Sequence, residues 1–193
     1  MTNPVRQRRL QVSAALAVAV VCWLAAAGNA LAQDAAQAAA AHSVKAAYLF
    51  KLPAYVDWPA QRFDSPDAAL TIGVLGADEV ADALAALTSG RTVNGHPVAV
   101  RRLQSDEGID GVHVLFFGST AAERAGRIAA DAAALNILTV TDLQAAFDDS
   151  VIDFVTVNGR VRFEVRLMAA ERNGLRLHAG LLDVAARVHG ARR

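Results

Sequence analysis

The sequence predicts an α/β fold: a single domain with a mixed, mainly parallel sheet flanked by helices and a C-terminal antiparallel hairpin. Two observations carry this prediction. Through the middle of the chain, short apolar runs alternate with helical patterns, as they do when helices connect the strands of a parallel sheet. Near the C-terminus, Asn158-Gly159 separates residues 151–157 from residues 160–167, and Asn-Gly between two strand-like segments indicates a two-residue hairpin turn.

The first 32 residues have the pattern of an export signal. Three arginines, Arg6, Arg8 and Arg9, precede an apolar run over residues 10–27. The run leads to Ala30-Leu31-Ala32, an A-x-A site of the kind that signal peptidase cleaves. A membrane span is the alternative, but no basic flank follows Ala32, so we expect a soluble periplasmic protein without membrane insertion.

The mature chain would have 161 of the 193 residues, the size of one domain. We expect an alanine-rich segment over residues 33–43 and one α/β domain over residues 44–190. Without the three arginines of the signal, the mature chain has 16 basic and 19 acidic residues, which gives a net charge of −3. A nucleic-acid partner is therefore not expected, because nucleic acids select clustered positive charge. The only cysteine, Cys22, lies in the signal, so no disulfide is expected.

The first predicted elements of the domain are a helix, a strand and a second helix. Apolar residues recur at helical spacing over residues 44–56, and Pro53 should kink or end that helix. Residues 70–75 read as a buried strand. Asp78 is placed to cap a helix that runs to Leu87. Asn94-Gly95 then indicates a hairpin between residues 92–93 and 96–103.

A second strand–helix pair follows. Residues 112–117 are continuously apolar, which indicates a strand covered on both faces. Thr120-x-x-Glu123 has the pattern of a capping box for a helix that ends near residue 133. Residues 137–140 form the next strand, and Thr141-x-x-Gln144 predicts the cap of another short helix.

The C-terminal hairpin has a register that its two-residue turn determines. Phe154 faces Phe163, and this face of the hairpin is largely apolar. On the opposite face, Asp153 is paired with Glu164, and like charges directly opposite each other destabilise a hairpin. The arginines at 162 and 166 lie diagonal to this pair and can offset it. This face is either a solvated charged surface or a recognition surface. A short helix ending at Asn173-Gly174 and a last helix at 181–185 complete the domain.

The residues that usually carry catalysis or bind metals form no recognisable pattern. No histidine of the mature chain stands three or four residues from another, so we predict no metal site and no cofactor. Ser119 lies in Gly118-Ser119-Thr120, which is not the G-x-S-x-G of a nucleophile elbow. Asp142, Asp148, Asp149 and Asp153 lack the spacing and the turn glycine of a calcium loop. We therefore expect that the protein is not an enzyme.

A ligand site is the alternative function. The turns at Gly76-Ala77-Asp78 and Gly118-Ser119-Thr120 follow two predicted strands. If these strands are neighbours, the turns meet at the carboxyl edge of the sheet, where open parallel sheets bind ligands. Gly76, Asp78, Ser119 and Thr120 are then candidate ligand-binding residues. Helix N-termini at this edge would favour an anion, and a nucleotide or an amino acid is also considered.

Two segments resemble the YfiR family of periplasmic proteins. The first is Lys45-Ala46-Ala47-Tyr48-Leu49-Phe50, which runs on to Tyr55-Val56-Asp57-Trp58-Pro59. The second is Asn158-Gly159-Arg160-Val161-Arg162-Phe163-Glu164-Val165, followed by Gly174-Leu175-Arg176-Leu177 and Leu181-Leu182. These segments are similar to the opening helix and to the C-terminal hairpin of the family, and the resemblance covers nearly the whole mature chain.

The resemblance implies a non-catalytic regulator. The best-known members of the family bind the periplasmic sensor domain of an inner-membrane diguanylate cyclase and hold it inactive, which lowers cyclic di-GMP and disfavours biofilm growth. Glu164 matches the glutamate of the family's F-E-[VI] motif, and we expect it to meet a cation or an amide of the partner. The other expected partner-binding residues are Asp153, Arg162 and Arg166 on the same face, and Leu175, Leu177 and Leu181 nearby.

The sequence departs from the family's pattern at several positions. Pro53 stands where a small helix former is usual, Arg166 replaces an asparagine, and His178-Ala179-Gly180 replaces a segment that contains serine. Family members studied most closely carry disulfides, so control through cysteine oxidation is not expected for this chain, whose only cysteine is Cys22. The sequence leaves open whether the protein forms a homodimer.

Overall fold

A computed structural model describes residues 33–104, 106–143 and 149–190 of the chain. Residues 33–51 are helical. The chain divides into two units after Ala40, and the second unit holds the fold described below. Within the described residues, no helix is long and apolar enough to cross a membrane. The expected signal, residues 1–32, and the helix expected after Thr141, which includes Gln144, lie outside the described residues.

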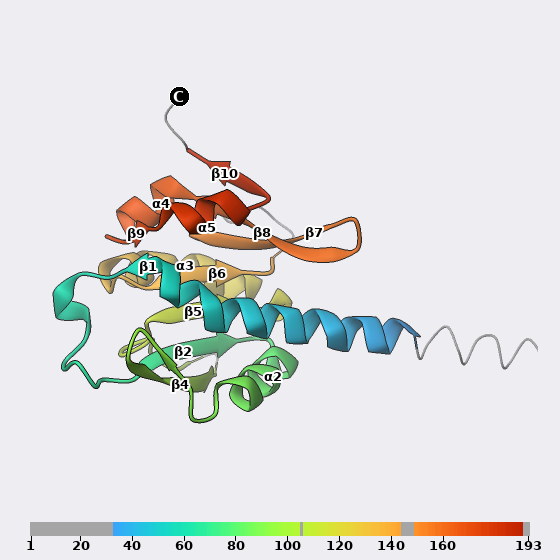
Figure 1. The fold of residues 1–193 in the computed structure, drawn as a ribbon, viewed down its shortest axis with the longest axis horizontal. Helices are drawn as coiled ribbons and strands as arrows, with labels where there is room; N and C mark the ends of the chain where they lie inside the picture. The colour runs from blue at the N-terminus through green and yellow to red at the C-terminus, as the bar shows by residue number, and fades with distance from the viewer. Residues whose placement is uncertain (1–32, 105, 144–148, 191–193) are drawn as a thin grey trace, which may run out of the picture. The chain divides into compact units, whose positions relative to one another are not determined.

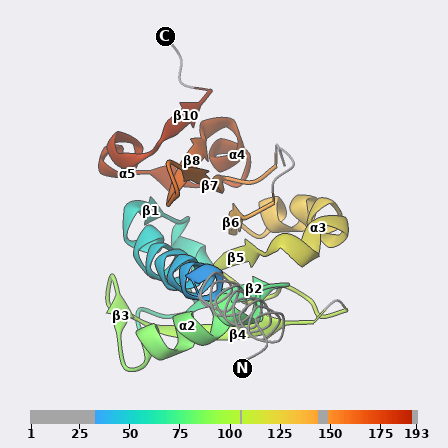
Figure 2. The same ribbon diagram turned by 90° about the vertical axis from the view of Figure 1, so that its right-hand side faces the viewer.

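The sheet of the second unit has eight strands. These are β2 (Leu70–Leu75), β3 (Thr92–Val93), β4 (His96–Leu103), β5 (Val114–Phe117), β6 (Leu138–Thr141), β7 (Ile152–Val157), β8 (Arg160–Arg166) and β10 (Arg187–His189). Their order is β10-β8-β7-β6-β5-β2-β4-β3. Figure 1 shows the strands from β10 at the top to β4 at the bottom, and β3 is labelled in Figure 2. The five strands from β7 to β4 run parallel, whereas β8 is antiparallel to β7 and β3 is antiparallel to β4. The predicted fold class is confirmed.

Helices pack on both faces of this sheet. They are α2 (Asp78–Thr88), α3 (Ala122–Ala134), α4 (Leu167–Arg172) and α5 (Ala179–Val184). Val80 and Leu84 of α2 belong to one buried apolar cluster, and Ala125 and Ile128 of α3 belong to another. Alternate side chains of a strand point to opposite faces of a sheet, so the two clusters are its two covered faces. Figure 2 shows α2 and α3 on opposite sides of the strands.

The strand order reverses between β2 and β5. From β2 the chain goes through α2 to β4 on one side, and β5 lies on the other side of β2. The order of the five parallel strands, counted along the chain, is therefore 2-1-3-4-5. In doubly wound sheets with this order, the loops after the first and third strands separate to opposite faces and leave a crevice at their carboxyl ends. In this chain, those loops begin at Gly76 and Gly118.

The first helix of the domain ends as Pro53 predicts. The α-helix continues to Lys51, and residues Leu52–Tyr55 form a 3-10 turn with proline in its first positions. Proline has no backbone N–H and cannot donate the hydrogen bond that would continue the helix. The next element along the chain is β1 (Val56–Asp57), which pairs with β9 (Arg176–Leu177) in a separate two-stranded sheet. The sequence did not indicate this small sheet.

Both predicted hairpins are confirmed, and the C-terminal one has the predicted register. Val93 pairs with His96, and Asp153 pairs with Glu164. Asn158 and Gly159 have φ values of 50° and 71°. Positive φ at both central residues defines the turn that matches the twist of hairpin strands, and Asn-Gly is the dipeptide that adopts it at least cost.

Two predicted helix caps are wrong. Ala77, not Asp78, is the N-cap of α2, and Asp78 is the first helical residue. The helix α3 begins at Ala122 after a 3-10 turn at Ser119–Ala121, and no side chain caps it. The Thr120 hydroxyl instead donates to the Gly76 carbonyl oxygen at 3.0 Å. That bond joins the two loops at the carboxyl edge of the sheet. The Thr120 hydroxyl therefore makes a tertiary contact instead of capping α3 as the local pattern predicted.

A stack of three rings lies at the other edge of the sheet, near the amino ends of the parallel strands. Phe63 lies between His96 and His113, with ring centroids 4.0 and 4.4 Å apart. Nδ1 of His113 accepts a hydrogen bond from the backbone N–H of Thr71 at 3.2 Å, and its Nε2 is buried without a partner among the described residues. Burial, followed by the charge of Arg62, lowers the pKa of His113 from 6.5 to about 4.

Candidate functional site

The polar face of the C-terminal hairpin is the first candidate site. We call it the charged face, and it consists of Asp153 on β7, Arg160, Arg162, Glu164 and Arg166 on β8, and Arg187 and His189 on β10. The strand β10 pairs in parallel with β8, which places Arg187 beside Glu164 and His189 beside Arg166. Phe163 and Val165 point to the opposite face and belong to the buried core. A three-stranded segment therefore carries the charges on one side and the core on the other.

Among the described residues, the two opposed carboxylates lie beside different cationic side chains. Nε of Arg166 donates to Oδ2 of Asp153 at 2.7 Å, and the Ser150 hydroxyl also bonds this carboxylate. Nε2 of His189 lies 2.6 Å from Oε2 of Glu164, and Nε of Arg187 lies 3.9 Å from its Oε1. The repulsion that the hairpin register predicts is thus relieved by separate partners, and those of Glu164 come from a strand that the sequence did not indicate.

Burial affects the ionisation of Asp153. Desolvation raises its pKa, and the hydrogen bond from Ser150 and the charge of Arg166 oppose this effect. Both Asp153 and Arg166 are largely covered, with side chains 10% and 18% exposed. These two residues therefore stabilise the end of the hairpin and are poorly placed to meet a partner.

Arginines are the charges that this face presents to solvent. The side chain of Arg187 is 69% exposed, against 22% for Glu164. Arg160 and Arg162 are also exposed, and together with Val157, Asn158 and Ala186 they line an open depression of about 580 Å³. The accessible part of the charged face is therefore basic.

The three leucines expected near the partner are buried or half-buried. Leu175 and Leu181 are 4% and 2% exposed and belong to the core. Leu177 is half-buried and pairs with Val56 in the small β1–β9 sheet. The side chains of Leu175 and Leu181 are covered by the protein itself, so they can support a surface by packing beneath it.

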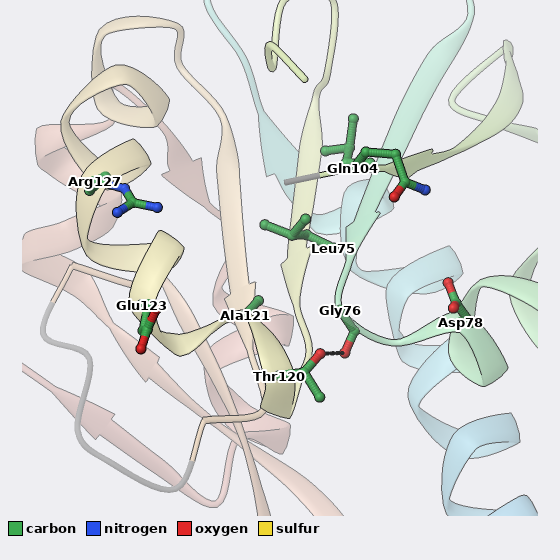
Figure 3. A pocket seen from close by; sticks show the side chains of 9 residues that line it. Leu75, Gly76, Asp78, Gln104, Thr120, Ala121, Glu123 and Arg127 are labelled. Atoms are coloured by element: carbon green, nitrogen blue, oxygen red, sulfur yellow. Dashed lines mark hydrogen bonds between the residues drawn. The ribbon is translucent and has the colours of Figure 1, made fainter. Parts of the chain in front are cut away.

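The crevice at the strand-order reversal is the second candidate site. We call it the switch-point pocket; its volume is about 370 Å³. Nine residues line it: Leu75, Gly76, Asp78, Leu103, Gln104, Thr120, Ala121, Glu123 and Arg127. Figure 3 shows Arg127 and Glu123 on α3 at one side and Asp78 across the opening at the start of α2. Three of the four residues predicted for a ligand site, Gly76, Asp78 and Thr120, line the pocket, and Ser119 does not.

The two loops of this pocket are held close together. The Gly118 N–H donates to the Leu75 carbonyl oxygen at 2.8 Å, and Thr120 donates to that of Gly76. A Cβ on Gly118 would lie 2.1 Å from the Gly76 oxygen, so only glycine permits this approach. The pocket is therefore shaped before any ligand arrives.

Several residues of both sites escaped the sequence analysis. Arg187 and His189 belong to a three-residue strand, and so short a segment has too few alternations to be recognised. Glu123 and Arg127 stand four residues apart on α3, which places them on one helical face, but only the fold shows that this face borders a crevice. Among the described residues, no group of three or more histidine, cysteine, aspartate or glutamate side chains is placed to hold a metal ion.

The fold and these sites define a doubly wound α/β protein with a basic surface on its C-terminal hairpin. Residues 42–186 match the model of the YfiR/HmsC-like family, and the chain belongs to that family. It is a family of periplasmic, non-catalytic regulators in diguanylate cyclase signalling, and the resemblance noted in the sequence is confirmed. No individually curated protein matches the chain significantly.

Proposed function

We propose that this protein binds the periplasmic sensor domain of an inner-membrane diguanylate cyclase and holds the enzyme inactive, so that less cyclic di-GMP is made. The protein acts by contact and catalyses no reaction. Family membership supports the signalling context. The observation that supports contact as the mode of action is the charged face, whose accessible arginines project from the backbone of paired strands.

The partner should present acidic groups. Exposed Arg160, Arg162 and Arg187 carry three positive charges on the outer part of the face. Arginine forms paired hydrogen bonds with carboxylates, and complementary charge raises both the rate and the specificity of association. Because Glu164 already has His189 and Arg187 beside it, it needs no cation from the partner. We propose that Glu164 positions Arg187 and His189 for contact and does not itself bind.

The experiment measures binding of the purified cyclase sensor domain to the wild-type protein and to charge-reversed variants. Arg162→Glu combined with Arg187→Glu should weaken binding at least tenfold, and added salt should weaken wild-type binding because it screens exposed charges. Arg91→Glu makes the same kind of change at an exposed position just before β3, the opposite edge of the sheet, and should leave binding unchanged.

The outcomes distinguish an error in the proposed function from an error in the assigned contact surface. If the wild-type protein does not bind the sensor domain at all, the proposed function is wrong. If it binds and the double reversal has no effect, the function stands and the charged face is not the contact surface. Sedimentation of the same samples shows whether the protein pairs with itself.

In cells, deletion of the gene should raise cyclic di-GMP, and the wild-type gene should restore the lower level. The double reversal should fail to restore it while accumulating to the same amount as the wild-type protein. Restoration by the double reversal would contradict the assignment of the surface.

A further inference from the structure

We infer that the switch-point pocket binds a small amino-carboxylate with a second cationic group, of which a basic amino acid is the simplest example. This inference concerns a site separate from the charged face, and it does not depend on the proposed function. It follows from the place of the pocket in the sheet, from its fixed shape and from the signs of the charges in its wall.

The strand order of the sheet explains why the switch-point pocket lies between the loops after β2 and β5. The loops after β2 and β5 lead into helices on opposite faces of the sheet, so no connection closes the space between them. Ligand sites of open parallel sheets lie at this point because several loops converge there without filling it. The volume of about 370 Å³ is near the lower end of the range for ligand pockets, about 300–1,000 Å³. The occupant should therefore be small.

The wall of the pocket disfavours an anion. Asp78 lies in the first turn of α2 and Glu123 in the first turn of α3. These carboxylates already complement the positive ends of their own helices, so the helix dipoles do not leave an unfilled anion site. Among the described residues of the wall, Arg127 is the single cation, and these residues together carry a net charge of −1. An anion such as phosphate would meet one favourable charge and two unfavourable ones.

The charged groups of the wall are available to a ligand. Among the described residues, the side chains of Asp78, Glu123 and Arg127 form no ion pair or hydrogen bond with other protein groups. Glu123 and Arg127 are four residues apart on the same helix, a spacing that permits an ion pair, but they are not paired with each other. Figure 3 shows Arg127 and Asp78 on opposite sides of the opening. A ligand that joins an anionic group to cationic ones can therefore satisfy both sides.

A diamino acid matches this arrangement group by group. Its carboxylate pairs with Arg127, and its two ammonium groups pair with Asp78 and Glu123. The amide of Gln104 completes the polar wall, and Leu75 and Leu103 offer apolar surface to the methylene chain. The net charge of +1 on such a ligand balances the −1 of the pocket.

Calorimetric titration of the purified protein tests this assignment with four compounds. L-Lysine should bind saturably. 1,5-Diaminopentane, which lacks the carboxylate, and L-norleucine, which lacks the second ammonium group, should each bind at least tenfold more weakly. L-Glutamate should not bind measurably. No binding of L-lysine, equal binding of 1,5-diaminopentane, or tighter binding of L-glutamate would each overturn the inference.

Variants assign the roles of the residues. Arg127→Gln should weaken L-lysine binding at least tenfold and leave 1,5-diaminopentane binding unchanged, whereas Asp78→Asn should weaken the binding of both. Asp131→Asn is the matched control, because it removes one exposed carboxylate from α3 outside the pocket. An effect of the control equal to that of Asp78→Asn overturns the assignment. The assignment is also overturned if L-lysine changes the chemical shifts of residues on the charged face and not those of Gly76 and Thr120.

Discussion

Acidification should destabilise the fold through one histidine. His113 is 5% exposed, stacks on Phe63 and has its Nε2 buried without a partner among the described residues. Since Nδ1 accepts a hydrogen bond from Thr71, the proton of the neutral ring lies on Nε2. A second proton would have to go on Nδ1, which would break that bond and place a charge beside Arg62.

The magnitude follows from the pKa. The folded protein holds the pKa of His113 at about 4, against 6.5 in an unfolded chain. Between these two values the unfolded chain binds the proton and the folded protein does not, so stability decreases as the pH falls from 6.5 to 4. At about 1.4 kcal/mol for each pH unit, the full effect is about 3 kcal/mol. A domain with a total stability of about 5–15 kcal/mol would lose a large part of it.

The assay is urea denaturation of the wild type and of His113→Asn at pH 7.5, 6, 5 and 4. Asparagine retains an acceptor for the Thr71 N–H but cannot take up a proton. The variant will be less stable at every pH because it loses the ring stack. Its free energy of unfolding should nevertheless fall by about 3 kcal/mol less than that of the wild type across this range. Asp64, Arg62 and His96, which lie around His113, are common to both proteins, so their titration largely cancels in the difference. Parallel curves, or a pKa near 6 for His113 by NMR, would refute the reasoning.

Three further predictions concern packing, charge and redox state. Gly118→Ala should lower stability by about 3 kcal/mol, because its Cβ would lie 2.1 Å from the Gly76 oxygen. Gly126→Ala on α3 meets no atom within 4 Å and should raise stability by about 0.5–1 kcal/mol; thermal melting of both variants checks this contrast, and equal effects would contradict it. Arg166→Met should cost about 2–3 kcal/mol by removing the cation beside buried Asp153, and adding Asp153→Leu should recover at least half of the loss. If denaturation shows that the double variant is less stable than Arg166→Met alone, the loss of stability in the single variant does not come from a buried carboxylate without its cation. The melting temperature should be the same with and without dithiothreitol, because the only cysteine is Cys22 in the expected signal; a drop of several degrees would show that a disulfide forms.

Several elements were predictable because the signals for them are local. Asn158-Gly159 determines the turn of the hairpin, and the turn determines that Asp153 faces Glu164. Pro53 ends the first helix because its ring leaves no backbone N–H to donate the next helical hydrogen bond. The apolar run at 112–117 indicated a strand covered on both faces, and the strand β5 is buried throughout.

The caps show where local reasoning fails. Thr120 and Glu123 have the spacing of a capping box, but the Thr120 hydroxyl bonds the Gly76 carbonyl oxygen, 44 residues away. Glu164 is a second example, because the sequence offered only Arg162 and Arg166 as its neighbouring cations within the chain. His189 and Arg187 lie 25 and 23 positions further along the chain, and the fold brings them beside it.

By itself, the sequence determined the class of fold, the register of the C-terminal hairpin and the family, because alternation, turn residues and motifs are properties of neighbouring residues. Only the tertiary structure decided which groups each site presents. It pairs the carboxylates of the charged face and leaves the arginines exposed, and it brings Asp78, Glu123 and Arg127 to one crevice. The physical reason is that the charge available at a surface depends on which distant strand or helix lies beside each group, and the order of strands in a sheet is not contained in any short segment.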